Sequence, residues 1–225
     1  MGSKFKKLNN PLVSIIVPVF NRAQVIADTL VSIVEQSYRN FECLIIDDGS
    51  TDQSWQIISE YKNRDDRFRL FRRPANKIKG ANSCRNIGIE KATGEYIIFF
   101  DSDDIMHQNC VEINLRVIEK SGCDYVITKT DDFLGRYDKF VRNSVDHKNY
   151  KFHLFPLSNL NYVTQRLNWL TPNLFVKREI LDNISFNENL SSGQEYNFFC
   201  KLTALTINGE FTNEVTSSRR IHENS

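Results

Sequence analysis

Short apolar runs alternate with amphipathic segments over the first half of the chain. The runs are rich in β-branched and aromatic residues, and they end in polar or turn-forming residues, a pattern that predicts buried strands. The segments between the runs carry apolar residues at helical spacing. Predicted strands cover residues 13–17, 41–46, 68–71, 96–100 and 123–128, and a predicted helix follows each of the first four. Such alternation is typical of a parallel sheet with helices on both faces.

The ends of the first elements also carry local signals. Pro18 is expected to stop the first strand, because proline cannot donate to a strand ladder. Asn21 is expected to cap the first helix, and Ser50 or Thr51 the second, because short polar side chains accept hydrogen bonds at helix starts. These signals predict where strands give way to loops.

The alternation ends after Lys129. Residues 129–160 mix polar and aromatic residues at no clear period, which is compatible with a β-hairpin excursion or with a mobile flap. Helical patterning returns over residues 195–205, and residues 211–215 are predicted to form a last strand. We expect this second half to complete one compact domain with the first.

Three carboxylates follow the predicted strand at 96–100. The segment reads Asp101-Ser102-Asp103-Asp104, at the end of a strand expected to be buried on both faces. Crowded carboxylates suit a hard divalent cation, which takes its remaining ligands from water and from substrate phosphates. The first hypothesis is therefore a metal–diphosphate site on Asp101 and Asp103. The alternative is an acidic loop that caps the next helix.

Two further polar clusters, residues 18–21 and 47–50, follow the first two predicted strands. Equivalent ends of parallel strands lie at one edge of a sheet, so the three clusters are expected to converge on one cleft. The basic loop 72–80, which includes Lys79, could face a diphosphate there. Taken singly, residues 47–50 could be a plain turn and helix cap, and the basic loop a solvated surface.

Composition limits the function classes. The net charge of +1 gives no electrostatic reason to expect a nucleic-acid partner. No apolar run approaches the roughly 20 residues that span a bilayer, and residues 1–10 are polar, basic and expected to be flexible rather than a secretory signal. The five cysteines lack CxxC spacing, which favours a reducing, cytoplasmic compartment without a cysteine metal site.

Four motifs together carry a resemblance to a known family. They are Val13–Asn21, Ile46–Asp52, Gly80-Ala81 with Arg85-Asn86-x-Gly88, and Asp101–Asp104. In their order and spacing they resemble glycosyltransferase family 2, over about residues 11–128. The resemblance implies the GT-A fold, a Rossmann-like and mostly parallel central sheet flanked by helices, with a smaller acceptor-side region. It also implies a nucleotide-diphospho-sugar donor, a divalent metal (Mn²⁺ or Mg²⁺) and inversion at the anomeric carbon.

Site residues follow from the resemblance position by position. Asp103 would bind the metal, and His222 matches a late histidine that reaches the metal or diphosphate in relatives. Glu195 stands where the family carries a catalytic aspartate, with Gln194 in place of the preceding glutamate. Residues expected to bind the donor are Pro18, Phe20, Asn21, Asp47, Asp48, Lys79, Arg85, Asp101 and Ser102.

The acceptor side is less specific. Trp169 and Tyr196 are expected either to stack on the sugar acceptor or to belong to the core. In the implied division, residues 11–128 form the nucleotide-sugar-binding half and residues 129–225 the acceptor-binding half of one domain. The acceptor would be a saccharide or a lipid-linked saccharide, as in polysaccharide biosynthesis, the latter with peripheral contact at the inner face of the membrane.

Two other classes of protein were compatible with parts of the pattern. An aspartyl-phosphate phosphohydrolase also places Asp-x-Asp after a buried strand, but usually on the first strand of the chain. A non-catalytic module that binds sugar nucleotides would share the donor motifs without turnover. The sequence does not identify the donor sugar, the acceptor or the oligomeric state.

Overall fold

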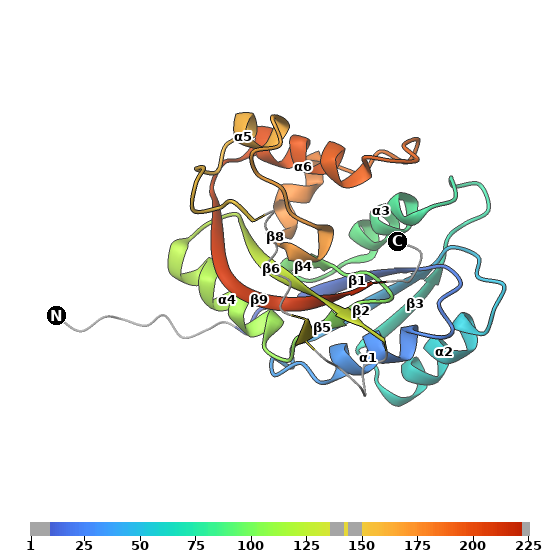
Figure 1. Ribbon diagram of the computed structural model, residues 1–225. Helices are drawn as coiled ribbons and strands as arrows, with labels where there is room; N and C mark the ends of the chain where they lie inside the picture. The colour runs from blue at the N-terminus through green and yellow to red at the C-terminus, as the bar shows by residue number, and fades with distance from the viewer. Residues whose placement is uncertain (1–9, 136–141, 144–149, 222–225) are drawn as a thin grey trace.

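The computed structural model describes residues 10–135, 142–143 and 150–221, and these residues form one mixed α/β unit around a curled sheet (Figure 1). The sheet has nine strands, eight of them in a continuous order and β7 paired to the side of β6. The order across the sheet is β3 (Phe68–Arg72), β2 (Phe41–Asp47), β1 (Val13–Val19), β4 (Tyr96–Phe99), β8 (Leu174–Lys177), β6 (Tyr125–Leu134), β9 (Gly209–Ile221) and β5 (Ile105–Met106).

The first four predicted strands are confirmed, and they are all parallel. β1 pairs with β2 from Val13 to Val19 and with β4 as far as Ile16, and β3 pairs with β2 on the outside. Pro18 does not stop β1, contrary to the expectation from sequence, because it pairs with Ile46 inside the β1–β2 ladder. Its ring nitrogen faces the side on which β4 has already ended, so the missing N–H costs no ladder hydrogen bond.

The parallel arrangement does not continue from β4 to β6. Instead β8, from the second half of the chain, lies antiparallel between them: Ile98 pairs with Phe175, and Phe175 also pairs with Val126. The last strand is longer than the predicted 211–215, since β9 spans Gly209–Ile221 and runs parallel to β6 with two register shifts. It curves strongly along the sheet (Figure 1).

Two layers of helices cover the sheet, as predicted. Helices α1 (Ile26–Val34), α2 (Ser54–Arg64) and α4 (Cys110–Ser121) lie on one face, and α3 (Ala81–Lys91), α5 (Asn159–Val163) and α6 (Gln194–Leu205) on the other (Figure 1). Side chains alternate along β1, so that Ile15 joins the first core and Ile16 the second. On the second face Phe186 stacks on Phe198 of α6 at 3.9 Å between ring centroids.

The predicted helix caps were wrong. Helix α1 begins at Ile26 without a side-chain cap, and Asn21 instead accepts a hydrogen bond from the Thr51 amide at 2.8 Å. Asp52, rather than Ser50 or Thr51, serves the start of α2, since it accepts from the amides of Ala23 at 3.0 Å and Ser54 at 2.9 Å. Asn21 and Asp52 therefore connect the loop that follows β1 to the loop that follows β2.

The irregular segment after Lys129 contains part of a hairpin. β6 continues to Leu134, and β7 (Arg142–Asn143) pairs antiparallel with it. This pairing favours the hairpin over the flap among the residues described. Further on, the 3₁₀ turns η2 (Thr171–Asn173) and η3 (Arg178–Asn183) flank β8.

Helix α3 packs unusually close to β1. A Cβ added at Gly88 would lie 2.3 Å from Cγ2 of Ile16, which is closer than any real contact. Glycine at this position therefore allows α3 to sit against the sheet and brings Arg85, one turn earlier, to the carboxyl edge of the strands.

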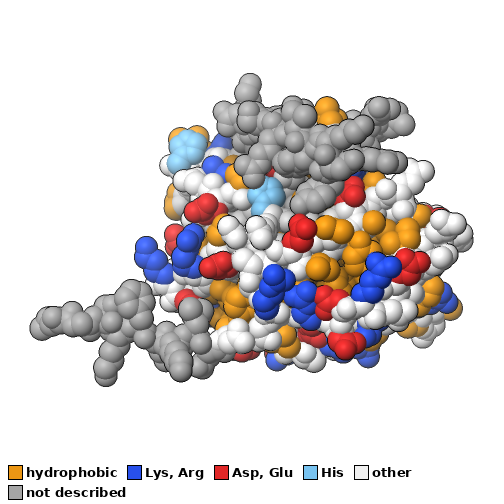
Figure 2. Space-filling view, turned by 90° about the horizontal axis from the view of Figure 1, so that it is seen from below, with side chains coloured by type: hydrophobic (Ala, Val, Ile, Leu, Met, Phe, Trp, Pro, Cys, Tyr) orange, Lys and Arg blue, Asp and Glu red, His pale blue; other side chains and the backbone are white. Residues whose placement is uncertain are grey.

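Charged side chains of both signs are interspersed on the face seen from below (Figure 2), in keeping with the net charge of +1. Among the residues described, no helix is long and apolar enough to cross a membrane. All five cysteines are free thiols.

Candidate active site

The three polar clusters meet at one edge of the sheet, as predicted. Val19 pairs with Asp47 at the ends of β1 and β2, and Asn21 then contacts Ser50 and Thr51 directly. The cluster that follows β4 joins them through Nε of Arg22, which lies 3.2 Å from Oδ2 of Asp103. One edge of the sheet therefore collects the loops that follow the parallel strands β1, β2 and β4.

Asp47 and Asp48 are both buried, but they face different partners. Asp47 accepts from the Ser50 amide at 3.2 Å and so shapes the turn, which is the plain role considered for it from sequence. Asp48 forms an ion pair with Arg73 of the basic loop, and Arg73 in turn donates to the Lys77 carbonyl at 2.6 Å. Asp48 thereby anchors the basic loop at this edge of the sheet.

Phe20 and Lys79 lie together at the rim. The Lys79 Nζ is 3.8 Å from the centroid of the Phe20 ring, within cation–π range, and Phe20 is 37% exposed. An exposed aromatic face beside a cation is suited to a planar, anionic ligand such as a nucleotide. Pro18 and Asn21 flank Phe20 in the same loop.

Asp101 is held by Arg85. Nη2 of Arg85 lies 2.9 Å from Oδ1 of Asp101, and the Arg85 side chain is 6% exposed against 33% for Asp101. Nε of Arg85 is buried without a hydrogen-bond partner in the structure. Ser102, the next residue, is also buried. The Arg85–Asp101 pair joins the start of α3 to the end of β4.

Glu195 lies in the first turn of α6, as the predicted helix implied. Its carboxylate accepts a hydrogen bond from the hydroxyl of Thr171 in η2. Burial raises the pKa of Glu195 above its ordinary value, and the negative charge of Asp101 raises it further, while Thr171 and Arg85 oppose the shift. Glu195 and Arg85 line the same hollow, of about 500 Å³. A carboxylate of raised basicity therefore faces the cavity that Arg85 also reaches.

Sequence reasoning missed Arg220, the residue that fixes the acidic loop. From β9 its side chain donates to the carbonyl of Asp103 at 2.9 Å and pairs with Asp28 of α1 at 2.8 Å, while its amide donates to Asp104 at 3.0 Å. Asp104 is thus buried rather than presented at the edge of the sheet. Only the tertiary fold brings residue 220 to residue 103, so no local signal could have identified this contact.

Sequence reasoning also missed two asparagines of α3 that hold the backbone of a distant segment. Asn82 donates to the Asn187 carbonyl at 2.7 Å, and Asn86 makes two bonds of 2.9 Å with the backbone of Phe186. They fix the segment that leads from η3 to α6, and thus to Glu195. Asn86 belongs to one of the four sequence motifs, but the motif does not indicate its partner, which lies 100 residues away.

The two acceptor candidates lie in different surroundings. Trp169 is 2% exposed and packs against Tyr162 and Phe199, so its expected stacking on an acceptor is corrected to the core alternative. Tyr196 is 39% exposed and lines the hollow beside Glu195. His222 lies outside the described residues.

A divalent cation fits the edge at Asp103. The residues described contain no group of three or more His, Cys, Asp or Glu side chains that would form a protein cage. A magnesium-like cation needs no such cage, because one or two carboxylates suffice when substrate phosphates and water complete its shell. The Asp103 carboxylate faces Arg22, whose side chain is 41% exposed and also donates to the Phe20 and Asn21 carbonyls.

Comparisons with known proteins give a family match and a set of relatives. The family model described as Glycosyl transferase family 2 matches residues 14–183. A Haemophilus influenzae protein described as an uncharacterized glycosyltransferase is 45% identical over 108 residues, which make up 48% of this chain and 42% of that protein. The chain therefore spans less than half the length of this relative.

Solved structures share the fold. TarS 1-349 of S. aureus in complex with UDP-GlcNAc has a TM-score of 0.76 at 24% identity, covering 95% of this chain and 59% of that one. The mannosyltransferase PcManGT from Pyrobaculum calidifontis, in complex with GDP-Man and Mn²⁺, has a TM-score of 0.72 at 16% identity, covering 96% and 58%. The predicted GT-A fold is confirmed by these superpositions.

Proposed function

Because the chain belongs to glycosyltransferase family 2, we propose that it transfers a sugar from a nucleotide-diphospho-sugar to a hydroxyl group of a saccharide or lipid-linked saccharide, with inversion. The observation that carries the proposal is the hollow shared by Glu195 and Arg85, which joins a basic carboxylate to the donor edge through the pair with Asp101. UDP is the first choice of nucleotide, supported by the UDP-GlcNAc in the TarS neighbour.

The donor lies along the edge of the three parallel strands. Phe20 packs against the base, and Pro18 and Asn21 shape the loop that carries Phe20. Asp48 forms a hydrogen bond with the edge of the base, and Asp47 holds the turn beside it. Lys79 and the loop anchored by Arg73 meet the diphosphate, while Asp101 and Ser102 lie against the ribose and sugar.

Asp103 would hold the divalent cation, Mn²⁺ or Mg²⁺, with water and diphosphate oxygens as the other ligands. When bound, such a cation neutralises charge on the diphosphate leaving group. The Mn²⁺ in the PcManGT neighbour supports this assignment. His222 is proposed as a further ligand from the resemblance alone.

Glu195 acts as general base. The acceptor oxygen forms a bond to the anomeric carbon as the bond from that carbon to the diphosphate oxygen breaks, and the hydroxyl proton passes to Glu195. Thr171 orients the carboxylate through its hydrogen bond, and Arg85 lines the same hollow on the donor side. Attack from the face opposite the leaving group inverts the anomeric centre.

Purified protein incubated with UDP-sugars, Mn²⁺ and a panel of saccharides tests the proposal by release of UDP and formation of glycoside. Glu195→Gln is expected to lower turnover at least about 100-fold, the usual contribution of a general base. Glu119→Gln, on the exposed face of α4, makes the same change away from the site and should leave turnover unchanged. Wild-type turnover in Glu195→Gln would overturn the assignment of the base.

The two alternative functions make different predictions. An aspartyl-phosphate phosphohydrolase would form a trappable phosphoryl-enzyme on Asp101, whereas the pair with Arg85 and the family match favour glycosyl transfer. A non-catalytic module would bind UDP-sugars in calorimetry without releasing UDP. The metal assignment has its own pair of variants. Loss of activity in Asp103→Ala would support the assignment if activity is retained in Asp66→Ala, since Asp66 is an exposed aspartate between α2 and β3.

A further inference from the structure

A second hollow continues the one that contains Glu195. It measures about 450 Å³ and lies at the end of α5. Both hollows are lined by Tyr162, Asn168, Gly193 and Tyr196. A molecule whose hydroxyl group reaches Glu195 would therefore extend into this second hollow, which the proposed chemistry does not itself require.

The second hollow is positively charged. Lys151 and Arg166 contribute to its lining, and none of the described residues that line it is an aspartate or a glutamate. Among the residues that the structure describes, the ion pairs found involve neither of these two cations. Arg166 lies 5.6 Å from the centroid of the Phe155 ring, a contact that does not neutralise its charge, whereas Arg85 and Arg73 are paired with carboxylates.

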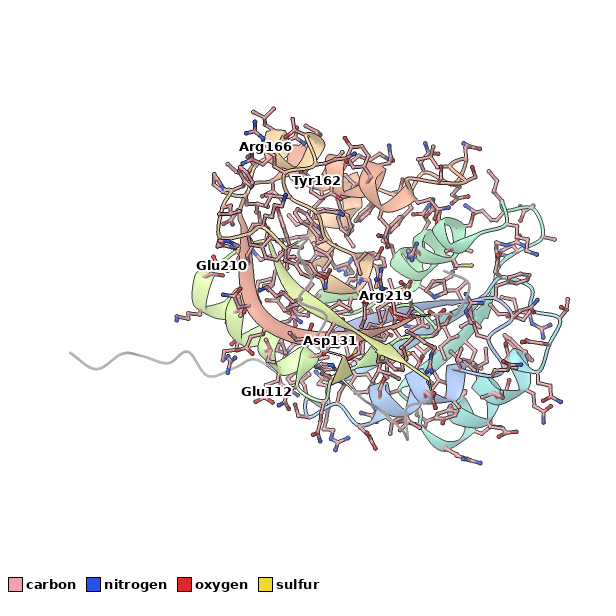
Figure 3. The ribbon with its side chains drawn as sticks, in the orientation of Figure 1. Glu112, Asp131, Tyr162, Arg166, Glu210 and Arg219 are labelled. Carbon is pink, nitrogen blue, oxygen red and sulfur yellow. The ribbon has the colours of Figure 1, made fainter. Side chains whose placement is uncertain are left out.

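The backbone that carries Arg166 is fixed by its turn. Gln165, which also lines the hollow, has φ 57°, a left-handed conformation that costs energy for a residue other than glycine. The turn is held because the amides of Arg166 and Leu167 both donate to the Asn161 carbonyl, at 2.9 and 3.0 Å. Figure 3 shows Arg166 next to Tyr162 at α5.

The wall between the two hollows is aromatic. The rings of Tyr162 and Tyr196 stack at 5.9 Å between centroids. The hydroxyl of Tyr196 donates to the Val163 carbonyl at 2.8 Å, which holds its ring in place. A flat aromatic wall suits the carbon face of a sugar or polyol, and the cations beyond it suit an anionic substituent.

We propose that the acceptor carries an oxyanion, a phosphate or a carboxylate, near its reacting hydroxyl group, and that Lys151 and Arg166 bind this oxyanion. This inference rests on the proposed glycosyl transfer. The planar fork of Arg166 can bind either oxyanion through two parallel hydrogen bonds, and Lys151 adds a mobile point charge. The proposed donor phosphates bind elsewhere, at the edge of β1, β2 and β4. The second hollow would therefore select acceptors by their charge independently of donor binding.

Nuclear magnetic resonance of the ¹⁵N-labelled chain tests the inference with three small probes. Glycerol 3-phosphate and glycerate present a phosphate or a carboxylate beside hydroxyl groups, and glycerol presents hydroxyl groups alone. Saturating UDP and Mg²⁺ are added first, so that the donor edge is filled. Both anions, or only one of them, are expected to shift the amides of residues 162–168 and 193–196, while glycerol is expected to leave them unchanged.

Paired variants separate this site from general surface charge. Lys151→Ala/Arg166→Ala is expected to weaken anion binding at least about tenfold, as lost charge-assisted hydrogen bonds would. Arg116→Ala/Lys120→Ala removes the same two charges from the exposed face of α4 and should leave the affinity unchanged. Equal shifts with glycerol, shifts confined to the basic loop 72–80, or unchanged affinity in the first variant would each overturn the inference.

The outcome is independent of the proposed donor. Titration with UDP alone measures binding at the edge of β1, β2 and β4, and titration with the anions measures binding in the second hollow. If UDP fails to bind but the anions shift residues 162–168, the donor assignment fails and the anion site stands. If UDP binds and the anions do not shift these residues, the anion site fails and the donor assignment stands.

Discussion

Nη2 of Arg85 lies 2.9 Å from Oδ1 of Asp101, so a buried guanidinium on α3 holds the first carboxylate that follows β4. Arg85 also lines the hollow that contains Glu195. One side chain therefore touches both the donor edge and the cavity of the proposed base, and its replacement should affect both.

Replacing Arg85 by alanine is expected to destabilise the protein by about 2 kcal/mol, because charged hydrogen bonds of this kind contribute roughly that amount. The variant should also bind UDP more weakly, since Asp101 loses its partner. Denaturant unfolding and calorimetry with UDP measure the two effects. Arg67→Ala, which breaks the pair with Asp65 away from the site, is the control and should change stability alone. Undiminished UDP affinity in Arg85→Ala would contradict the role given to the Arg85–Asp101 pair.

The raised pKa of Glu195 predicts how activity depends on pH. Burial and the charge of Asp101 raise this pKa above its ordinary value of 4.5, so turnover should rise with pH as the carboxyl group ionises at a pH above 4.5. A pH profile of turnover measures this limb. The limb should disappear in Glu195→Gln, and its persistence there would assign it to another group.

The same shift affects stability, with a defined sign. A carboxyl group whose pKa is higher in the folded than in the unfolded state contributes stability at low pH, and this contribution is lost as pH rises through the folded-state pKa. Glu195→Gln should therefore melt at a higher temperature than the wild type at pH 7, with the difference shrinking towards pH 4. Thermal unfolding at the two pH values checks it, and a variant less stable at pH 7 would contradict it.

Gly88→Ala is expected to destabilise the fold by about 1–3 kcal/mol, as overpacking does, because the new methyl group would lie 2.3 Å from Cγ2 of Ile16. Denaturant unfolding measures the loss. Adding Ile16→Ala removes the atom in the way, so the double variant should lose less stability than the sum of the two single variants. Strict additivity would mean that the helix adjusts in some other way.

Arg220→Met is expected to cost about 2–3 kcal/mol, because it leaves Asp28 and the carbonyl of Asp103 without their charged donor. The acidic loop should loosen, and UDP affinity in the presence of Mg²⁺ should fall with it. Arg219→Met is the matched control, since Arg219 is 42% exposed and points to Asp132 instead. Equal losses in the two variants would argue against a specific role for Arg220.

The parallel part of the fold could be predicted because its signals are local. β1, β2 and β4 are apolar runs rich in β-branched residues, and each is followed by polar residues that meet at one edge, as Asn21 and Thr51 do. The position of Asp103 at that edge could be predicted for the same reason, whereas the role proposed for Glu195 came from the family resemblance. What these motifs did not contain was the direction of β8.

The direction of β8 depends on long-range packing. Leu174–Lys177 reads as an apolar strand whichever way it runs, and its place between β4 and β6 is decided by side chains from both halves of the chain. Arg220 and Asn86 act over similar sequence distances. The predicted helix caps were wrong because the same short polar residues form hydrogen bonds at helix starts and between loops.

The insertion of β8 limits how this chain could be recombined with its relatives. A chimera that joined residues 11–128 of this chain to a foreign second half would leave β4 dependent on a strand it did not evolve beside, since Ile97 and Ile98 meet Val176 and Phe175 there. Without a matching partner, β4 and β6 would each present an open edge to other chains. Exchange of acceptor preference is therefore better attempted by grafting the short stretch 150–168 than by swapping halves.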